Sequence, residues 1–164
     1  MNSAAKPHPS RGLEPPVIRK IAPEDKTQWM GLWEGYNAFY GRSGASALPL
    51  EVSETTWSRF FDPREPVEAL VASDGSELTG LAHYILHRST TSIADTCYLQ
   101  DLFTRPDRRG QGIARRLVEQ VCAEARAAGA PRVYWQTHHT NAVARLLYDK
   151  MAEDSGFIVY RIIL

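Results

Sequence analysis

The apolar positions of the chain follow two spacings, and these separate predicted helices from predicted strands. A stripe with steps of three and four residues, the period of one helix face, consists of Trp29, Leu32, Trp33, Tyr36 and Tyr40. So many aromatic side chains on one stripe could line a pocket for an apolar or cationic ligand. Packing in the protein core is the favoured interpretation, because amphipathic helices bury such a face.

Other segments show either helical spacing or an enrichment in strand-forming residues. Strands are expected at residues 17–21, 67–72, 78–87, 95–104, 132–137 and 157–164, with a hairpin turn at 73–76. Helices are expected from Pro23 through the aromatic stripe, at 53–61, at 112–128 and after Asn141.

This order of elements places meandering strands before a strand–helix–strand crossover. It predicts an α/β fold, in which helices pack on a mixed sheet. We expect residues 17–164 to form a single domain and residues 1–16, which are rich in Ala, Pro and Ser, to form a flexible tail.

The composition excludes several classes of function. Nineteen Lys and Arg residues balance nineteen Asp and Glu residues, so the overall charge favours neither nucleic acid nor an anionic membrane as a partner. No stretch approaches the ~20 apolar residues that span a bilayer, and no signal peptide is recognisable. Cys97 and Cys122 are the two cysteines, too few for a disulfide framework. A reduced, cytoplasmic protein is expected.

A local anion site is predicted where the strand ending at Thr104 leads through Pro106 into a loop of arginines and glycines. This loop opens directly into a helix, whose first backbone N–H groups have no intrahelical partner and carry a partial positive charge. Glycines let a phosphate approach that backbone, and arginines supply countercharge. Besides those of the loop, Arg108, Arg115 and Arg116 lie close enough in sequence to contribute.

Two common nucleotide motifs do not fit this loop. A P-loop needs a lysine and a hydroxyl residue directly after its last glycine, and neither follows Gly112. A Rossmann fingerprint needs a third glycine and a position after the first strand, whereas this loop follows several strands.

The loop segment 109–114, Arg-Gly-Gln-Gly-Ile-Ala, resembles the Arg/Gln-x-x-Gly-x-Gly/Ala signature of the GNAT superfamily of acetyl-CoA-dependent N-acetyltransferases. The resemblance extends to the neighbouring strand and helix, to residues 141–148, to Gly156-Phe157 and to the order of elements. Segment 98–103 is similar to the Tyr-Leu-Glu-Asp-hydrophobic-Phe segment of diamine, thialysine and histone/polyamine-type acetyltransferases. The resemblance implies a central, mostly antiparallel twisted sheet flanked by about four helices.

The resemblance also implies how acetyl-CoA would bind. Its pantetheine arm would pair with the backbone of Leu102, Phe103 and Thr104 beside a β-bulge, where an N–H group could polarise the thioester. Its pyrophosphate would bind the N–H groups of the loop and helix start, Arg109, Gly110, Gln111, Gly112, Ile113, Ala114 and Arg115.

Asn141 and Tyr148 match the family pattern Asn-x-x-Ala-x-x-Leu-Tyr. Asn141 can cap a helix, bind a pantetheine amide, or do both. Tyr148 is the candidate general acid, because a leaving thiol of pKa ~8.5 departs more easily if a phenol donates a proton.

The acceptor amine must lose a proton, since an alkylamine has a pKa of ~10.4. Asp101 is the candidate catalytic carboxylate, with Glu34 and His83 as further candidates. Gln100 stands where the polyamine-type pattern has glutamate, and a neutral amide cannot neutralise a cation. This difference weakens the case for a polyamine and leaves room for an amino acid or a less charged amine. Asp101 follows on the strand and points to the opposite face.

Gln100, Trp135 and Gln136 are the candidate acceptor-binding residues, and the loop at His138-His139 is expected to rim the site. His83 and His87 share a strand face but lie far apart, and no thiol or carboxylate pattern joins them. No metal is therefore predicted.

These observations predict an N-acetyltransferase that transfers the acetyl group of acetyl-CoA, by direct attack, to a primary amine of a small molecule: a polyamine, a lysine analogue or an amino acid. Acetylation of a protein or peptide amine, such as a histone-like lysine, is the alternative within the enzyme class. A non-catalytic acyl-CoA-binding regulatory module is the alternative outside it. The family resemblance implies a homodimer, and the apolar segment 157–164 is compatible with strand pairing across subunits.

Overall fold

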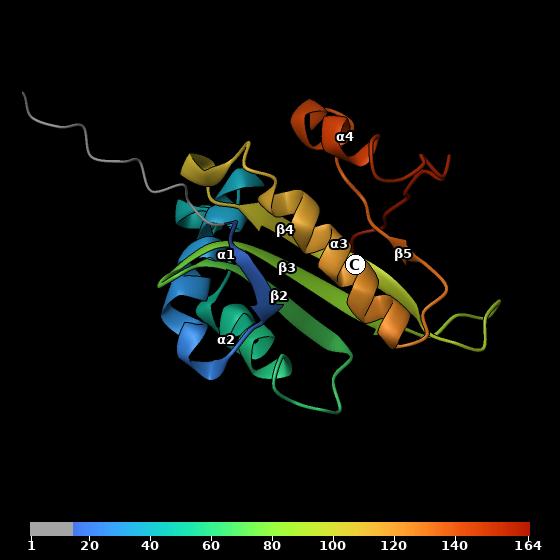
Figure 1. Ribbon diagram of the computed structural model, residues 1–164, viewed down its shortest axis with the longest axis horizontal. Helices are drawn as coiled ribbons and strands as arrows, with labels where there is room; N and C mark the ends of the chain where they lie inside the picture. Colours follow the sequence, from blue (N-terminus) through green and yellow to red (C-terminus); the bar gives the residue numbers. More distant parts are fainter. Residues whose placement is uncertain (1–14) are drawn as a thin grey trace, which may run out of the picture.

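The computed structural model describes residues 15–164, which form an α/β fold around a curled mixed sheet, as predicted (Figure 1). In this part of the chain the sheet has five strands in the order β1-β2-β3-β4-β5. The strands are β1 (Val17–Lys20), β2 (Val67–Asp74), β3 (Glu77–His87), β4 (Thr96–Thr104) and β5 (Val133–Tyr134). The first four pair antiparallel, and β5 runs parallel to β4.

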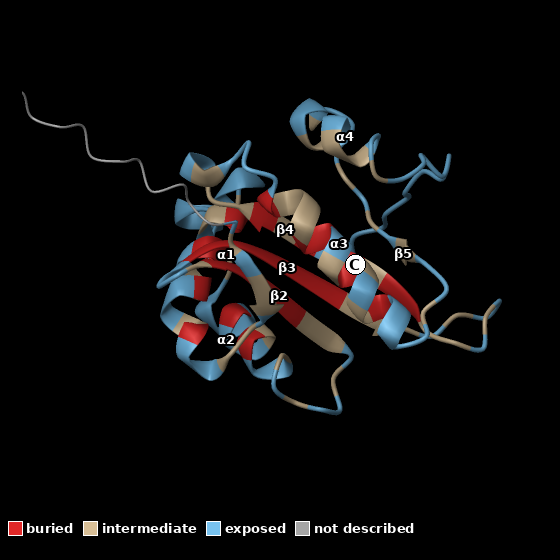
Figure 2. Cartoon of the chain, in the orientation of Figure 1, coloured by how far each residue is buried: buried red, intermediate tan, exposed pale blue. Residues whose placement is uncertain are grey.

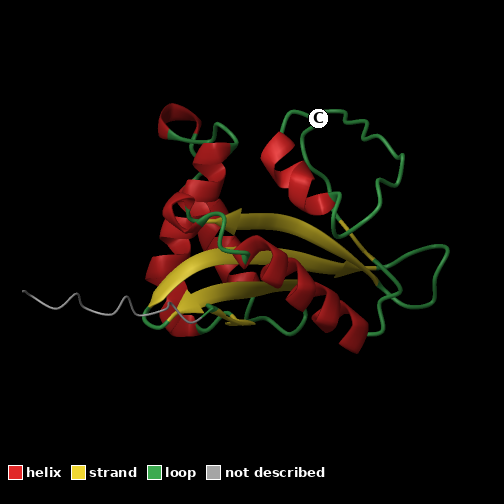
Figure 3. Ribbon diagram, turned by 45° about the horizontal axis from the view of Figure 1, so that its top comes forward, coloured by secondary structure: helices red, strands yellow, loops and turns green. Residues whose placement is uncertain are grey.

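Helices cover both faces of this sheet (Figure 3). The four α-helices of the described residues are α1 (Lys26–Phe39), α2 (Leu50–Arg59), α3 (Ile113–Ala127) and α4 (Ala142–Tyr148). α1 and α2 pack on one face and α3 on the other, each over its own apolar cluster. α4 stands apart from the sheet, beyond β5 (Figure 1).

The aromatic stripe of α1 is core, as the favoured interpretation held. Trp29, Leu32, Trp33 and Tyr36 are buried, and Tyr40 at the end of the stripe is 42% exposed. Burial runs along the middle of the sheet and the inner sides of the helices, whereas the segment after α4 is exposed (Figure 2). The core therefore lies in two layers, one on each side of β2, β3 and β4.

One irregularity in β4 changes which way its side chains point. In the pairing of β3 with β4, His83 lies opposite Asp101 and Tyr84 lies opposite Leu99, so Gln100 has no partner and forms a β-bulge. Strict alternation would put Leu99 and Asp101 on the same face. The bulge instead leaves Leu99 packed toward α3 and turns Asp101 toward α1.

Two predicted strands differ from the structure. β5 spans two residues instead of 132–137, because it diverges from β4 after Tyr98 and Tyr134 and its backbone then has no strand to pair with. Segment 157–164 was predicted as a strand but has no regular structure, since no strand of residues 15–164 lies beside it. α2 also begins three residues earlier than predicted.

Of the predicted tail, residues 1–14 lie outside the described part of the chain. Among the helices that are described, none combines the length and the apolar character needed to cross a membrane.

Candidate active site

The predicted anion loop lies at the start of α3. Gly110 and Gly112 have φ angles of +76° and +77°, a backbone region that favours glycine, and a Cβ on either would meet open space. The N–H of Arg116 donates to the carbonyl of Gly112 at 3.1 Å. The N–H groups of residues 113–115 precede this first helical bond, so the turn presents unpaired donors beside an open loop.

The arginines near this loop differ in what they contact. Arg108 is held by Asp74, with Nη2 2.8 Å from Oδ2. Arg109 donates from Nε to the carbonyl of Thr104 at 3.3 Å, and its guanidinium lies over the ring of Phe39. Arg109 therefore keeps its terminal amino groups available for an anion, whereas Arg108 is tied to a carboxylate.

A gap opens between β4 and β5. The two strands pair only at Cys97 with Val133 and at Tyr98 with Tyr134, so beyond Tyr98 the outer edge of β4 faces no other strand in residues 15–164. The side chain of Phe103 packs against the α1 and α2 layer, and that of Leu102 against the α3 layer. Their side chains are thus structural, and their backbone groups are the ones free to bind an extended ligand.

Thr104 ends the same stretch. Its Oγ1 is buried without a hydrogen-bond partner among the described residues. A buried hydroxyl left unsatisfied costs stability unless a ligand or water pairs with it. This orphaned atom fits a strand edge that binds a polar, extended arm.

Asp101 sits at the bulge and is 7% exposed. Its Oδ2 lies 3.0 Å from Nδ1 of His83, which is buried on the neighbouring strand β3. The other ring nitrogen of His83, Nε2, accepts a hydrogen bond from the indole N–H of Trp29 at 2.9 Å. Both nitrogens of this buried imidazole are therefore satisfied.

Three tyrosines surround the Asp101 carboxylate. Burial raises the pKa of Tyr36, and the nearby charge of Asp101 raises that pKa further. Burial and then Asp101 also raise the pKa of Tyr40. The pKa of Tyr98 is raised by burial first, then by Tyr134 and Asp101. The carboxylate therefore lies in a buried environment rich in aromatic rings and hydroxyl groups.

Arg42, which was not predicted from the sequence, borders the tyrosines around Asp101. Its guanidinium lies over the rings of Tyr36 and Tyr40, 5.7 and 5.5 Å from their centroids, and its Nε donates to Oδ1 of Asn37 at 2.7 Å. Its two terminal amino groups have no hydrogen-bond or ion-pair partner within residues 15–164. An arginine two residues past the aromatic stripe was the available sequence signal.

Tyr148 ends α4 and stacks edge to face on Trp135, with ring centroids 5.3 Å apart. Burial raises its pKa to about 12, with the neighbouring hydroxyl of Tyr40 as the second cause. The ends of α1 and α4 therefore bring Tyr40 and Tyr148 within electrostatic range of each other.

Asn141 stands at the N-cap position of α4, but its side chain makes no capping bond in the described structure, so that predicted role is wrong. Its backbone adopts φ −79° and ψ 64°, and its Nδ2 donates instead to Oγ1 of Thr137 at 3.2 Å.

The other residues predicted for the site are exposed or make surface contacts. Gln100 and Gln136 are exposed, and His138 and His139 lie in the exposed loop before α4. Arg115 contacts Glu119 at 4.0 Å. Within residues 15–164 no group of three or more His, Cys, Asp or Glu side chains is arranged to hold a metal ion.

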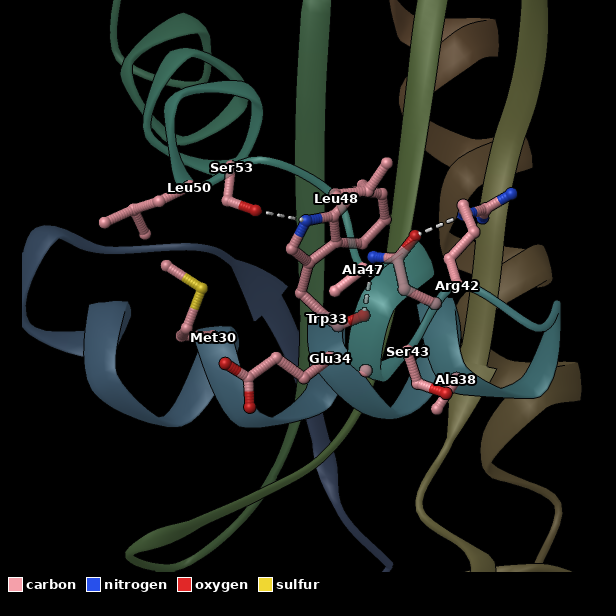
Figure 4. A pocket seen from close by; sticks show the side chains of 12 residues that line it. Met30, Trp33, Glu34, Ala38, Arg42, Ser43, Ala47, Leu48, Leu50 and Ser53 are labelled. Atoms are coloured by element: carbon pink, nitrogen blue, oxygen red, sulfur yellow. Dashed lines mark hydrogen bonds between the residues drawn. The ribbon is translucent and has the colours of Figure 1, made fainter.

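Glu34 lines a cavity to which Arg42 also contributes. This cavity of about 430 Å³ lies between α1, α2 and the segment that joins them (Figure 4). Its carboxylate and the guanidinium of Arg42 point in opposite directions in this view. Glu34 and Arg42 therefore line the same cavity with their charged ends turned apart.

The chain belongs to the acetyltransferase (GNAT) family, whose model matches residues 29–152. It is thus an N-acetyltransferase of a family that uses acetyl-CoA, as the loop signature predicted. It is similar to the D-amino-acid N-acetyltransferase HPA3 of Saccharomyces cerevisiae, with 34% identity over 88% of this chain and 89% of the relative. It is also 30% identical to the uncharacterized N-acetyltransferase YhfO of Bacillus subtilis, over 87% and 94% of the two chains.

Solved structures share the fold. One is AAC(6')-Iy in complex with the bisubstrate analogue CoA-S-monomethyl-acetylneamine, with a TM-score of 0.76 and 14% identity, covering 90% of this chain and 97% of the other. At this identity the likeness concerns the fold alone.

Proposed function

We propose that the protein transfers the acetyl group of acetyl-CoA to the primary amine of a small molecule in the gap between β4 and β5. The observation that carries this proposal is the bulge at Gln100. It turns the carboxylate of Asp101 toward α1, into the cluster of tyrosines that also reaches Tyr148. A carboxylate and a protonated phenol at one site are the groups that amine acetylation needs.

The donor would bind along features already described. The unpaired N–H groups at the start of α3, with Arg109 beside them, suit a pyrophosphate. The free edge of β4 suits the amides of pantetheine, which would add to the sheet like a further strand. The amide of Asn141 and the hydroxyl of Thr104, whose Oγ1 has no partner among the described residues, are further polar groups that the arm could meet.

The reaction then needs one proton removed and one supplied. Asp101 would bind the ammonium form of the amine and direct its proton to solvent. The amine nitrogen attacks the thioester carbon, the C–N bond forms, and the C–S bond breaks. The coenzyme leaves as a thiolate, which takes a proton from Tyr148, and the phenolate regains a proton when the acetylated nitrogen loses its second N–H proton to become the amide. With a pKa of about 12, Tyr148 is protonated at neutral pH and able to donate.

The charges around the site favour an amino acid as the acceptor. The hydroxyl of Tyr36 is close to Asp101, and the guanidinium of Arg42 lies over the ring of Tyr36. Asp101 suits the amino group and Arg42 suits a carboxylate, which arginine binds through two parallel hydrogen bonds. The similarity to a D-amino-acid N-acetyltransferase supports the same substrate class.

A polyamine or a histone-like peptide fits less well. Both are polycations, and a site for them would gather several carboxylates. Within residues 15–164 a single carboxylate, Asp101, acts on Tyr36 and Tyr40, and Arg42 would repel a second positive charge.

The test is acetyl-CoA-dependent thiol release with matched acceptors: D- and L-amino acids, their amides, a polyamine and a histone-tail peptide. We expect release with amino acids and a fall of at least ~100-fold for Asp101→Asn. CoA binding with no release for any amine would favour the non-catalytic alternative. Release with the polyamine or peptide alone would overturn the substrate class.

We also propose a homodimer, in which segment 157–164 pairs with a second copy. Its apolar side chains are 65–114% exposed: Phe157, Ile158, Val159, Tyr160, Ile162, Ile163 and Leu164. Such a patch marks an interaction surface. Light scattering should give twice the chain mass, and Ile158→Glu with Ile162→Glu should give a monomer. A monomeric wild-type protein would contradict this assembly.

A further inference from the structure

We propose that Trp29 and His83 form a positioning pair that holds Asp101 as an oriented, fully charged carboxylate. This inference deepens the proposed function and rests on it, because Asp101 matters only if it receives the amine. Trp29 and His83 do not contact the substrate, because both are almost completely buried. They act through Asp101.

The hydrogen bonds assign the tautomer of His83. An indole nitrogen is a donor only, so the 2.9 Å contact from Trp29 requires a lone pair on Nε2 of His83. The ring proton of the neutral imidazole then lies on Nδ1 and points at Oδ2 of Asp101, 3.0 Å away. His83 is thus a neutral donor to the carboxylate.

Two features oppose protonation of His83. An Nε2–H would face the indole N–H of Trp29, placing two donors against each other. The imidazole also lies among the rings of Trp29, Trp33 and Phe60, with centroids 4.8–5.9 Å away, where a charge is poorly solvated. An imidazolium would cancel the charge of Asp101, whereas the neutral ring orients the carboxylate and leaves its charge for the amine.

The groups that surround Trp29 and His83 keep one charge state near neutral pH. Trp29, Trp33 and Phe60, from α1 and α2, do not titrate, and Asp101 is the charged group that contacts His83 from β4. Around Asp101 lie three tyrosines with raised pKa values, which stay neutral, and one guanidinium, which stays charged: Tyr36, Tyr40, Tyr98 and Arg42. A new ionisation in a variant would therefore not come from these neighbouring groups.

The first test uses the unaltered protein. Nitrogen-15 NMR of labelled histidines, with the His83 signal assigned by its loss in His83→Asn, should show a neutral ring protonated on Nδ1 at neutral pH. A ring protonated on Nε2, or on both nitrogens at neutral pH, would overturn the inference.

The second test removes the indole donor. Trp29→Phe removes the N–H that faces Nε2, so we expect kcat/KM to acquire one additional ionisation that the wild-type profile lacks, with activity lost on the acidic side. Trp57→Phe is the matched control, because Trp57 is buried against Trp29 and makes no hydrogen bond to His83. The control should keep the wild-type pH profile. Identical profiles for both variants would contradict the pair.

The variant Asp101→Asn distinguishes failure of the proposed function from failure of the positioning pair. If Asp101→Asn retains full activity, the proposed function of the carboxylate fails. If it is inactive while Trp29→Phe and Trp57→Phe behave alike, the proposed function stands and the positioning pair fails. His87→Asn replaces a partly exposed histidine on the same strand, should leave the profile unchanged, and controls for the loss of an imidazole.

Discussion

The indole of Trp135 supports the phenol of Tyr148 edge to face, at a centroid distance of 5.3 Å and an interplanar angle of 61°. Trp135 directly follows β5, and Tyr148 is the last residue of α4. The contact therefore links the open side of the sheet to the helix that stands apart from it. Edge-to-face pairs are worth about 0.5–1.5 kcal/mol beyond their buried area, enough to favour one ring position.

Tyr148→Phe tests whether the hydroxyl of Tyr148 supplies the proton to the coenzyme thiolate. The phenylalanine ring keeps the packing on Trp135 but cannot donate. We expect kcat to fall by ~10²–10⁴-fold while the Kd for CoA is unchanged, because general acids contribute about that much. Stopped-flow or steady-state thiol release and calorimetric CoA binding measure the two quantities.

Tyr84→Phe is the matched control. Burial raises the pKa of Tyr84 to about 12 as well, but this tyrosine packs in the α3 layer and accepts a hydrogen bond from Lys20. Its loss should lower stability and leave kcat unchanged. Equal kcat values for both variants would remove Tyr148 from the reaction. In the wild-type enzyme the acid form persists well above pH ~10, where an ordinary tyrosine ionises.

Gly112→Ala tests the anion loop through its backbone. Gly112 precedes α3 with φ +77°, and an alanine there costs about 1–2 kcal/mol or shifts the loop, although its Cβ meets open space. We expect weaker CoA binding together with a modest loss of stability. Gly75→Ala, at φ +66° in the β2–β3 turn and equally open, should lose stability without losing affinity.

The sequence predicted the parts of the fold whose cause is local. The period of the α1 stripe is set by residues that all lie on one helix, so burial of Trp29 and Trp33 followed from it. Likewise, the glycines before α3 and the unpaired N–H groups after them belong to one short segment. Features that depend only on residues close together in the sequence can be predicted from that sequence.

The parts that could not be predicted depend on pairing between distant segments. Nothing in Gln100 indicates a bulge, which arises only when β4 is aligned with β3, and that bulge decides the direction of Asp101. The divergence of β5 from β4 is also a property of two strands together. For the same reason the contact of Arg42 with Tyr36 was missed, since it needs the turn after α1 to fold back.

Arg42→Gln tests the proposed amino-acid specificity. A lost charge-assisted hydrogen bond is worth about 1.5–3 kcal/mol, so kcat/KM for amino acids should fall by roughly 10–150-fold. Amino-acid amides, which lack the carboxylate, should lose little. Arg42→Lys should recover part of the activity, because lysine keeps the charge but not the paired geometry. An equal fall for acids and amides would assign Arg42 a structural role.

Asp25→Asn tests how firmly α1 is held in place. The carboxylate of Asp25 accepts hydrogen bonds from Nη1 and Nη2 of Arg19 at 2.6 and 2.8 Å and from the N–H of Ala22 at 2.8 Å, and it is 4% exposed. These bonds tie β1 to the start of the helix that carries Trp29. We expect the free energy of unfolding at neutral pH to fall by about 2 kcal/mol, as for other hydrogen bonds to charged groups.

The pH dependence of this loss identifies its cause. The hydrogen bonds from Arg19 are the largest influence on Asp25 and lower its pKa. The carboxylate therefore contributes its stability in full above its unfolded pKa of ~3.9, and that contribution disappears as the pH falls through the lower folded value. In urea titrations the gap between wild type and Asp25→Asn should shrink in acid. Asp62→Asn, which removes an exposed ion pair with Arg64, should show little change in unfolding free energy at either pH. A gap for Asp25→Asn that stays constant with pH would mean that packing, not charge, fixes the start of α1.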